Sequence, residues 1–143
     1  STSRRQRQMC IRDSYQFAVE LGMAFQLQDD LLDSYGGEEL GKTIGGDILE
    51  GKKSYLMVTA MSRATEEQRE VLRHTYKDAS LSPEEKIARV RGVFDALDVP
   101  RLTEQQISLR FDRALATLDG LDVPDARKEP LREYARGLMG RKK

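Results

Sequence analysis

The sequence predicts an all-α protein with no sheet. Apolar side chains recur at helical spacing along most of the chain, and no stretch of useful length alternates apolar with polar residues as a strand does. Serine, threonine, glycine and proline lie between the apolar segments, where helices are expected to begin and end. Together these observations favour a series of helices joined by loops.

The first predicted helix runs from about Tyr15 to Tyr35. Gly36 and Gly37 follow it and are typical of a helix end. Six glycines lie in the range 36–53, so this range is predicted to be a loop. Four apolar residues of the helix share the spacing of a face turned toward a partner: Phe17, Leu21, Ala24 and Leu31.

The next three helices have start signals of their own. Ser54 is a suitable N-cap, because its side-chain oxygen can accept a hydrogen bond from the first turn. The string Thr65-Glu66-Glu67-Gln68 resembles a capping box. Ser82 followed by Pro83 opens a further helix, with serine as N-cap and proline in the first turn. The predicted ranges are 54–65, 65–76 and 82–97.

The last two predicted helices span about 100–120 and 125–138. Pro100 and Thr103 introduce the first of them, and Gly120 ends it. Its apolar residues at helical spacing are Ile107, Phe111, Leu115 and Leu118. The final helix leads into a basic tail.

Composition indicates one modest hydrophobic core. Hydrophobic residues make up 38% of the chain and charged residues 34%. The formal net charge is +0, from 24 basic and 24 acidic residues, which argues against a nucleic-acid partner. The single cysteine excludes an intrachain disulfide, and no run approaches the roughly 20 apolar residues that span a bilayer. We therefore expect a cytoplasmic protein with no membrane span.

The acidic end of the first predicted helix is the most informative segment. On a helix, Asp29 and Asp33 lie one turn apart on the same face, and Asp30 lies at its edge. Like charges at this spacing each cost about 0.2–0.5 kcal/mol, which a bound divalent cation would reverse. Mg²⁺ is the natural candidate, because it combines one or two carboxylates with waters and substrate phosphates. A solvated helix face is the alternative interpretation for three aspartates alone.

Small and uncharged side chains precede the aspartates on the same face. Gln26, Gly22 and Ala18 form this stripe. This stripe leaves space for the apolar tail of a ligand with a charged head group. Close packing of another helix at Gly22 is the alternative interpretation of the same residues.

The segment Leu21 to Asp33, LGMAFQLQDDLLD, resembles the second aspartate-rich motif of the trans-isoprenyl diphosphate synthases. This polyprenyl synthetase family includes the farnesyl and geranylgeranyl diphosphate synthases. Gly41-Lys42 and the range 44–52 are similar to the loop that follows the motif in the family. The resemblance extends from about Tyr15 to the last residue, and its downstream parts are 54–58, 63–68, 86–90 and 140–143.

The resemblance implies a fold and an activity. The fold would be the C-terminal helical portion of the isoprenoid synthase helical barrel. The complete enzyme would be a Mg²⁺-dependent prenyltransferase and a homodimer. It would condense an allylic diphosphate with isopentenyl diphosphate, by ionisation, condensation and elimination, to a short-chain trans-prenyl diphosphate. Product chain length is set mainly beside the family's first aspartate-rich motif, so this sequence does not define it.

The resemblance also implies residue roles, none of them as nucleophile or base. The metal ligands would be Asp29, Asp30 and Asp33. The allylic diphosphate would contact Gln26, Lys42 and Lys52, and the allylic chain would lie beside Phe25 and Gly22. The tail over isopentenyl diphosphate would be Arg141, Lys142 and Lys143. Ordinary core for Phe25 and solvated surface for the lysines are the alternatives, and Asp47 either orients a lysine or water or caps the loop.

Several parts of the family pattern have no counterpart in this sequence. The family's first aspartate-rich motif, its isopentenyl diphosphate-binding basic residues and its Lys-Thr pair all belong upstream of the matched region. We therefore expect residues 15–143 to be the C-terminal part of a polyprenyl synthetase domain, inactive by itself. Residues 1–14 are strongly basic and resemble a translated sequencing adaptor, so a non-native or disordered leader is expected.

Two other classes share parts of this pattern. A class I terpene cyclase has a similar helical fold, but the Gly41-Lys42 pair and the 47–52 segment favour the chain-elongating enzymes. A non-catalytic helical subunit of a heteromeric synthase is the second alternative. The intact set of three aspartates and two lysines argues against it.

Overall fold

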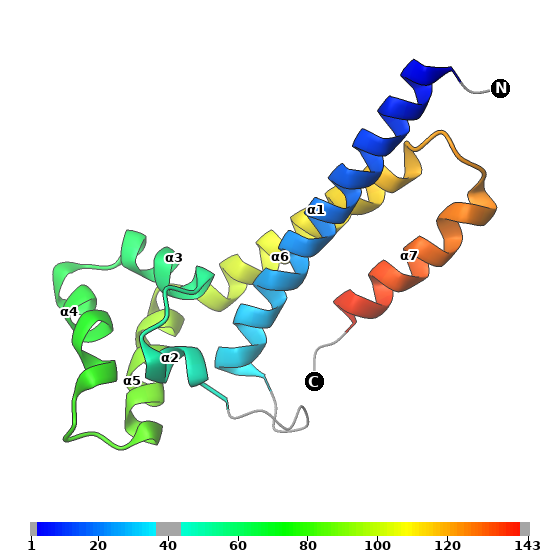
Figure 1. Cartoon of the computed structure of the whole chain (residues 1–143). Helices are drawn as coiled ribbons and strands as arrows, with labels where there is room; N and C mark the ends of the chain where they lie inside the picture. Colours follow the sequence, from blue (N-terminus) through cyan, green and yellow to red (C-terminus); the bar gives the residue numbers. More distant parts are fainter. Residues whose placement is uncertain (1–2, 37–43, 141–143) are drawn as a thin grey trace. The chain divides into compact units, whose positions relative to one another are not determined.

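The computed structural model describes residues 3–36 and 44–140, and the elements within these ranges are all helical, without a strand. The all-α prediction is confirmed (Figure 1). None of these helices combines the length and the apolar character that crossing a bilayer requires. The elements are α1 (Arg4–Tyr35), α2 (Gly46–Glu50), α3 (Tyr55–Arg63), α4 (Glu66–His74), the 3₁₀ turn η2 (Thr75–Lys77), α5 (Pro83–Ala96), α6 (Val99–Asp119) and α7 (Asp125–Met139).

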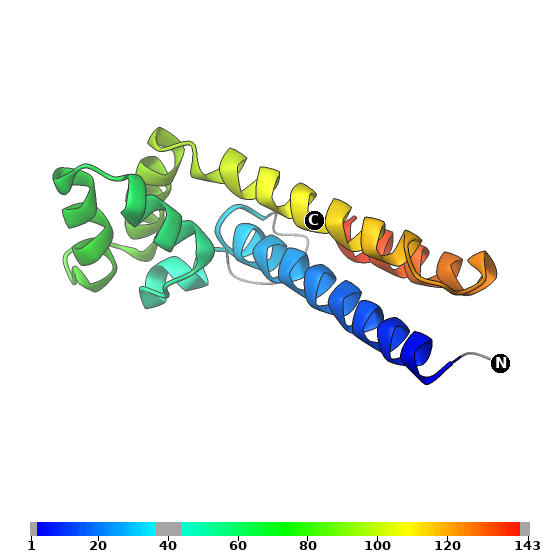
Figure 2. The same cartoon turned by 90° about the horizontal axis from the view of Figure 1, so that it is seen from above.

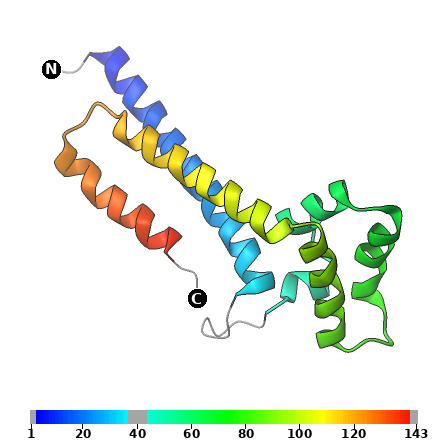
Figure 3. The same ribbon diagram turned by 180° about the vertical axis from the view of Figure 1, so that it is seen from behind.

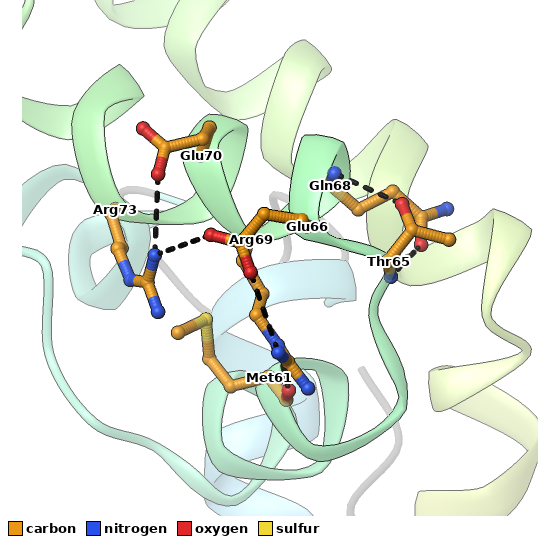
Figure 4. Close-up of polar contacts among 7 residues, drawn as sticks. All are labelled: Met61, Thr65, Glu66, Gln68, Arg69, Glu70 and Arg73. Carbon is orange, nitrogen blue, oxygen red and sulfur yellow. Dashed lines mark hydrogen bonds and ion pairs between the residues drawn. The ribbon is translucent and has the colours of Figure 1, made fainter.

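The three predicted N-caps are confirmed. Ser54 Oγ accepts from the Met57 N–H at 3.2 Å, and Ser82 Oγ caps α5 in the same way, with Pro83 as its first residue. Thr65 forms a complete capping box at α4. Its Oγ1 accepts from the Gln68 N–H at 3.2 Å, and Gln68 Oε1 accepts from the Thr65 N–H at 2.9 Å (Figure 4).

Two boundaries differ from the prediction. Helix α1 begins at Arg4 rather than near Tyr15, so the basic segment from Arg4 onward is helical. Arginine, glutamine and methionine are good helix formers, and extending an existing helix is far easier than nucleating one. The short helix α2 lies inside the predicted glycine-rich loop, between Gly45 and Gly51, which both have positive φ. A non-native origin of residues 1–14 stays a prediction.

The described chain divides into two compact units. One contains residues 3–26 and 106–140, and the other contains 27–36 and 44–105. Helices α1 and α6 each contribute residues to both units. Each unit has its own hydrophobic core.

The first unit packs the beginning of α1 against the later part of α6 and against α7. Figure 3 shows the chain reversing direction between α6 and α7. At this reversal, Lys128 Nζ donates to the Asp119 carbonyl at 2.7 Å, which satisfies an acceptor at the end of α6. The predicted inward face of α1 is confirmed by the burial of Phe17 and Leu21. The buried core consists of Phe17, Leu21, Ala114, Leu118, Leu121 and Ala135.

The second unit is organised around α5. Figure 2 shows α2, α3 and α4 gathered around this helix. Val90 and Phe94 of α5 are almost fully buried and lie in the same cluster as Leu56 of α3 and Leu72 of α4. Ile48 of α2 is also buried there. The core therefore fixes α2 and α3, the two helices on either side of Lys52.

Candidate functional site

The end of α1 is held against α5 by Tyr35. The Tyr35 hydroxyl donates to Asp95 Oδ1 at 2.8 Å, and the Arg91 guanidinium lies over the ring, 4.8 Å from its centre. Burial, followed by the hydrogen bond to Asp95, raises the pKa of Tyr35 far above its ordinary value. The phenol therefore stays protonated and keeps donating. This contact fixes the turn of α1 that carries the acidic residues.

Two of the three aspartates bind the main chain of the following segment. Asp33 accepts twice, through its carbonyl from the Gly45 N–H at 2.6 Å and through Oδ2 from the Asp47 N–H at 2.8 Å. Asp30 Oδ2 accepts from the Tyr55 N–H at 2.9 Å. Asp29 lies on the same turn of α1 and is exposed. The acidic end of α1 is thus joined to both ends of the segment 45–55.

Lys52 is placed by the way α2 ends. Its N–H donates to the Asp47 carbonyl at 2.9 Å, and the Gly51 N–H donates to the Ile48 carbonyl at 3.2 Å, which together make a Schellman motif. Gly51 has φ 69°, a left-handed conformation that favours glycine. The Lys52 ammonium lies 3.8 Å from Asp47 Oδ1, and its side chain is 54% exposed. Lys53 is exposed, as expected for a solvated lysine.

Negative charge gathers around Asp47. Burial raises the pKa of Asp47 above its ordinary value of 3.8, and the carboxylate of Asp33 raises it further. Asp30 and Glu50 act in the same direction, and the nearby Lys52 ammonium opposes them. Within the described part of the chain, the Lys52 ammonium by itself does not balance these carboxylates, and a cation would be stabilised here.

The donor chemistry fits Mg²⁺ shared with a phosphate ligand. Asp30 and Asp33 each use Oδ2 in the contacts above, which leaves Oδ1 available within the described part of the chain. In that part, no group of three His, Cys, Asp or Glu side chains is placed to hold a metal by itself. Mg²⁺ commonly takes only one or two protein carboxylates and completes its octahedron with waters and phosphate oxygens.

The other predicted residues have different surroundings. Gln26 is exposed and Phe25 is half-buried. At Gly22, a Cβ would meet no described heavy atom within 4 Å, so no described neighbour requires glycine there. Lys42 and the tail residues Arg141, Lys142 and Lys143 lie outside the described residues.

Sequence reasoning missed the contacts that organise the site. Tyr35 follows the aspartate-rich segment directly, but nothing in the sequence shows that its partner is Asp95. The Asp47 carboxylate lies 3.8 Å from the Lys52 ammonium, and its carbonyl accepts from the Lys52 N–H, so both interpretations of Asp47 stay predictions. Gly45 and Gly51 bound α2 at the spacing of one short helix, but glycines at this spacing are equally typical of a loop.

The fold and site together define an all-helical protein with an aspartate-rich helix end next to a lysine-bearing turn. The sequence model described as polyprenyl synthetase matches residues 2–93. The chain belongs to the polyprenyl synthetase family. This match begins earlier than the start near Tyr15 that the sequence motifs indicate.

Similar proteins agree with this assignment. Human farnesyl pyrophosphate synthase is 34% identical over 106 residues, which cover 74% of this chain and 25% of the human protein. The farnesyl pyrophosphate synthase of Nezara viridula is 43% identical over 89 residues, 62% of this chain and 21% of that protein. The chain spans about a quarter of the length of the curated relatives it matches.

Solved structures share the helical fold. A geranylgeranyl pyrophosphate synthase from Corynebacterium glutamicum, complexed with isoprenyl diphosphate and magnesium, has a TM-score of 0.81 and 34% identity. The match covers 92% of this chain and 37% of that one. The polyprenyl synthetase of Streptomyces coelicolor A3(2) has a TM-score of 0.82 and 25% identity, with 96% and 41% covered. The chain therefore has the isoprenoid synthase helical fold, and it spans part of it.

Proposed function

We propose that this chain is the C-terminal part of a prenyltransferase that condenses an allylic diphosphate with isopentenyl diphosphate. The observation that carries the proposal is the continuous set of contacts from Asp33 through Asp47 to Lys52. It brings carboxylates suited to Mg²⁺ and an ammonium suited to a diphosphate onto one small segment. The similar Corynebacterium synthase, solved as a complex with isoprenyl diphosphate and magnesium, supports the same ligand class.

The residue roles follow from charge. Asp29, Asp30 and Asp33 would hold Mg²⁺, which when bound stabilises negative charge on the departing diphosphate. Lys52 would contact the allylic diphosphate directly, and the resemblance adds Lys42 and Gln26 to that contact. Phe25 and Gly22 would lie beside the allylic chain, and the tail 141–143 would bind isopentenyl diphosphate.

The chemistry needs charge stabilisation rather than a side-chain nucleophile. The allylic carbon–oxygen bond breaks, and its electron pair leaves with the diphosphate. The double bond of isopentenyl diphosphate then attacks the allylic cation, and a proton is lost to the departing diphosphate. Lys52, held at a defined position on the Schellman turn, would stabilise the leaving group as its charge develops. A homodimeric complete enzyme, a short-chain product and a cytoplasmic location stay predictions from the resemblance.

Binding of inorganic pyrophosphate tests the ligand assignment on the chain itself. Calorimetric titration with pyrophosphate and Mg²⁺ should show Mg²⁺-dependent binding that Lys52→Ala weakens by about 10- to 100-fold, the usual worth of a hydrogen bond to a charged group. Lys53→Ala is the matched control, since the neighbouring lysine is also exposed, and should bind like the wild type. Equal affinity in wild type and Lys52→Ala would contradict the proposal.

The chain alone should have negligible synthase activity, because it spans only part of its relatives. An assay with geranyl diphosphate, isopentenyl diphosphate and Mg²⁺ should yield no sustained prenyl diphosphate product. Sustained turnover would overturn this part of the proposal. It would leave the binding assignment intact.

A further inference from the structure

Asp30 and Asp33 also act on the start of the helices that follow them. The first N–H groups of any helix lack partners within the helix and need an acceptor from elsewhere. The N-cap residue of α2 is Gly45, which makes no side-chain cap hydrogen bond. Asp33 supplies the acceptor instead, because its Oδ2 takes the N–H of Asp47 in the first turn of α2.

Helix α3 shows the same arrangement. Its N-cap Ser54 accepts from the Met57 N–H, which leaves the N–H of the first helical residue, Tyr55. Asp30 Oδ2 takes this N–H at 2.9 Å. Asp30 and Asp33 lie three residues apart on α1, so they project from neighbouring positions of one face. A single face of α1 thus holds the starts of two successive helices.

Lys52 lies between these two held points. On its N-terminal side, Asp47 is fixed by Asp33 and in turn accepts from the Lys52 N–H at 2.9 Å. On its C-terminal side, Tyr55 is fixed by Asp30. The Asp47 carboxylate faces the Lys52 ammonium at 3.8 Å. These contacts are made by protein groups alone, and together they define the main chain of Lys52.

We propose that Asp30 and Asp33 are positioning residues for Lys52, in addition to any metal they hold, because they fix both ends of the segment that carries it. Asp47 transmits the contact from Asp33 to Lys52. The part of this proposal that concerns diphosphate rests on the proposed function, whereas the capping role stands on the hydrogen bonds alone. The two roles of each carboxylate use different properties. Metal binding needs the negative charge, and capping needs only an acceptor oxygen.

This difference defines the variants. Asparagine keeps an acceptor oxygen and loses the charge, whereas alanine loses both. Amide hydrogen exchange of the chain in EDTA, followed by NMR, should show about tenfold faster exchange at Asp47 and Lys52 in Asp33→Ala, because each lost hydrogen bond lowers the free energy of local opening. The same increase should occur at Tyr55 in Asp30→Ala. The Asp→Asn variants should exchange like the wild type. Unchanged exchange in both alanine variants, or equal loss of protection in the asparagine variants, would overturn the proposal.

Amides of α5 provide the internal reference. Val90 and Phe94 lie in the buried core of the same unit, so their protection should persist when only the segment 45–55 is released. If an alanine variant unfolds completely, its asparagine counterpart still decides the question. Asp112→Ala is the matched control, because Asp112 is an exposed aspartate in the interior of α6. It should leave exchange at Asp47, Lys52 and Tyr55 unchanged.

Pyrophosphate titration in EDTA separates positioning from metal binding, because the two roles predict opposite changes in pyrophosphate affinity when an aspartate is removed. Without metal, removing a carboxylate near an anion should strengthen pyrophosphate binding by reducing repulsion. If the aspartates position Lys52, Asp30→Ala and Asp33→Ala should instead weaken it toward the affinity of Lys52→Ala. If the alanine variants bind pyrophosphate as tightly as the wild type or more tightly, the proposal that these aspartates position Lys52 is wrong. If the wild type binds no pyrophosphate with or without Mg²⁺, the proposed function fails, and the exchange data still test the capping role.

Discussion

Replacement of Gly51 by alanine should destabilise the chain more than any ordinary glycine-to-alanine change. Gly51 has φ 69°, where a side chain costs about 1–2 kcal/mol. A Cβ there would also lie 2.5 Å from Cε2 of the Tyr76 ring, and such overpacking costs roughly 1–3 kcal/mol. The sum, about 2–5 kcal/mol, is a large fraction of the 5–15 kcal/mol that typically stabilises a domain. Because Gly51 precedes Lys52, the variant should also weaken pyrophosphate binding.

Gly92→Ala is the matched control. Gly92 lies within α5, and a Cβ there would meet no described heavy atom within 4 Å. The same chemical change should therefore stabilise the chain by about 0.5–1 kcal/mol. Urea unfolding followed by circular dichroism measures the stability of both variants. The unfolding midpoint should fall for Gly51→Ala and rise for Gly92→Ala, with the same dependence of the unfolding free energy on urea concentration.

A double-mutant cycle with Tyr76→Leu separates the two causes. The coupling between Gly51→Ala and Tyr76→Leu should be about 1–3 kcal/mol, the steric part, because the leucine leaves the unfavourable φ in place. If Gly51→Ala unfolds at the wild-type midpoint, both the left-handed turn and its contact with the ring are refuted.

Three further predictions concern the core, a cap and a titrating group. Phe94→Ala should lower the free energy of unfolding by about 3–5 kcal/mol in urea, since this side chain is 1% exposed. A loss under 1 kcal/mol would contradict its place in the core. Thr65→Ala should cost about 1 kcal/mol in the same assay by removing the capping box (Figure 4), and Thr65→Ser should restore most of it. Burial and the charge of Asp33 raise the pKa of Asp47 above 3.8, so the folded state holds this proton more tightly than the unfolded state does. The stability that Asp47 contributes is therefore lost as pH rises from about 4 through its folded pKa. Across this pH range, the free energy of unfolding of Asp47→Asn should rise relative to that of the wild type. A pH-independent difference between the two would contradict this.

Local signals made much of the fold predictable. Ser54, Thr65 and Ser82 act through hydrogen bonds to residues three positions ahead, so the sequence contains all the information that these caps need. The early start of α1 was missed because the basic residues before Tyr15 lack apolar periodicity, although Ser3 and Gln6 have the residue types and spacing of a capping box. Helix α2 was missed because Gly45 and Gly51, which bound it, are equally typical of a loop.

The candidate site was predictable in its residue types and not in its connections. Helical spacing and the family resemblance indicate Asp30, Asp33 and Lys52 as candidates, and their roles stay predictions. Their linkage depends on contacts between distant parts of the chain, such as Asp33 with the Asp47 N–H and Asp30 with the Tyr55 N–H. The acceptors are side chains and the donors are main-chain groups, which every residue except proline carries. No pattern of residue types could therefore indicate these pairs.

The half-buried phenol of Tyr35 gives the chain an optical reporter. The sequence has five tyrosines and no tryptophan, so near-ultraviolet absorbance and emission come mainly from tyrosine. Because burial and the hydrogen bond to Asp95 raise its pKa, Tyr35 ionises at more alkaline pH than a free tyrosine would. Its late step in a spectrophotometric titration would therefore follow the docking of the acidic end of α1 on α5. Comparing that step with and without Mg²⁺ and pyrophosphate would reveal, without an attached label, whether ligands tighten or loosen this junction.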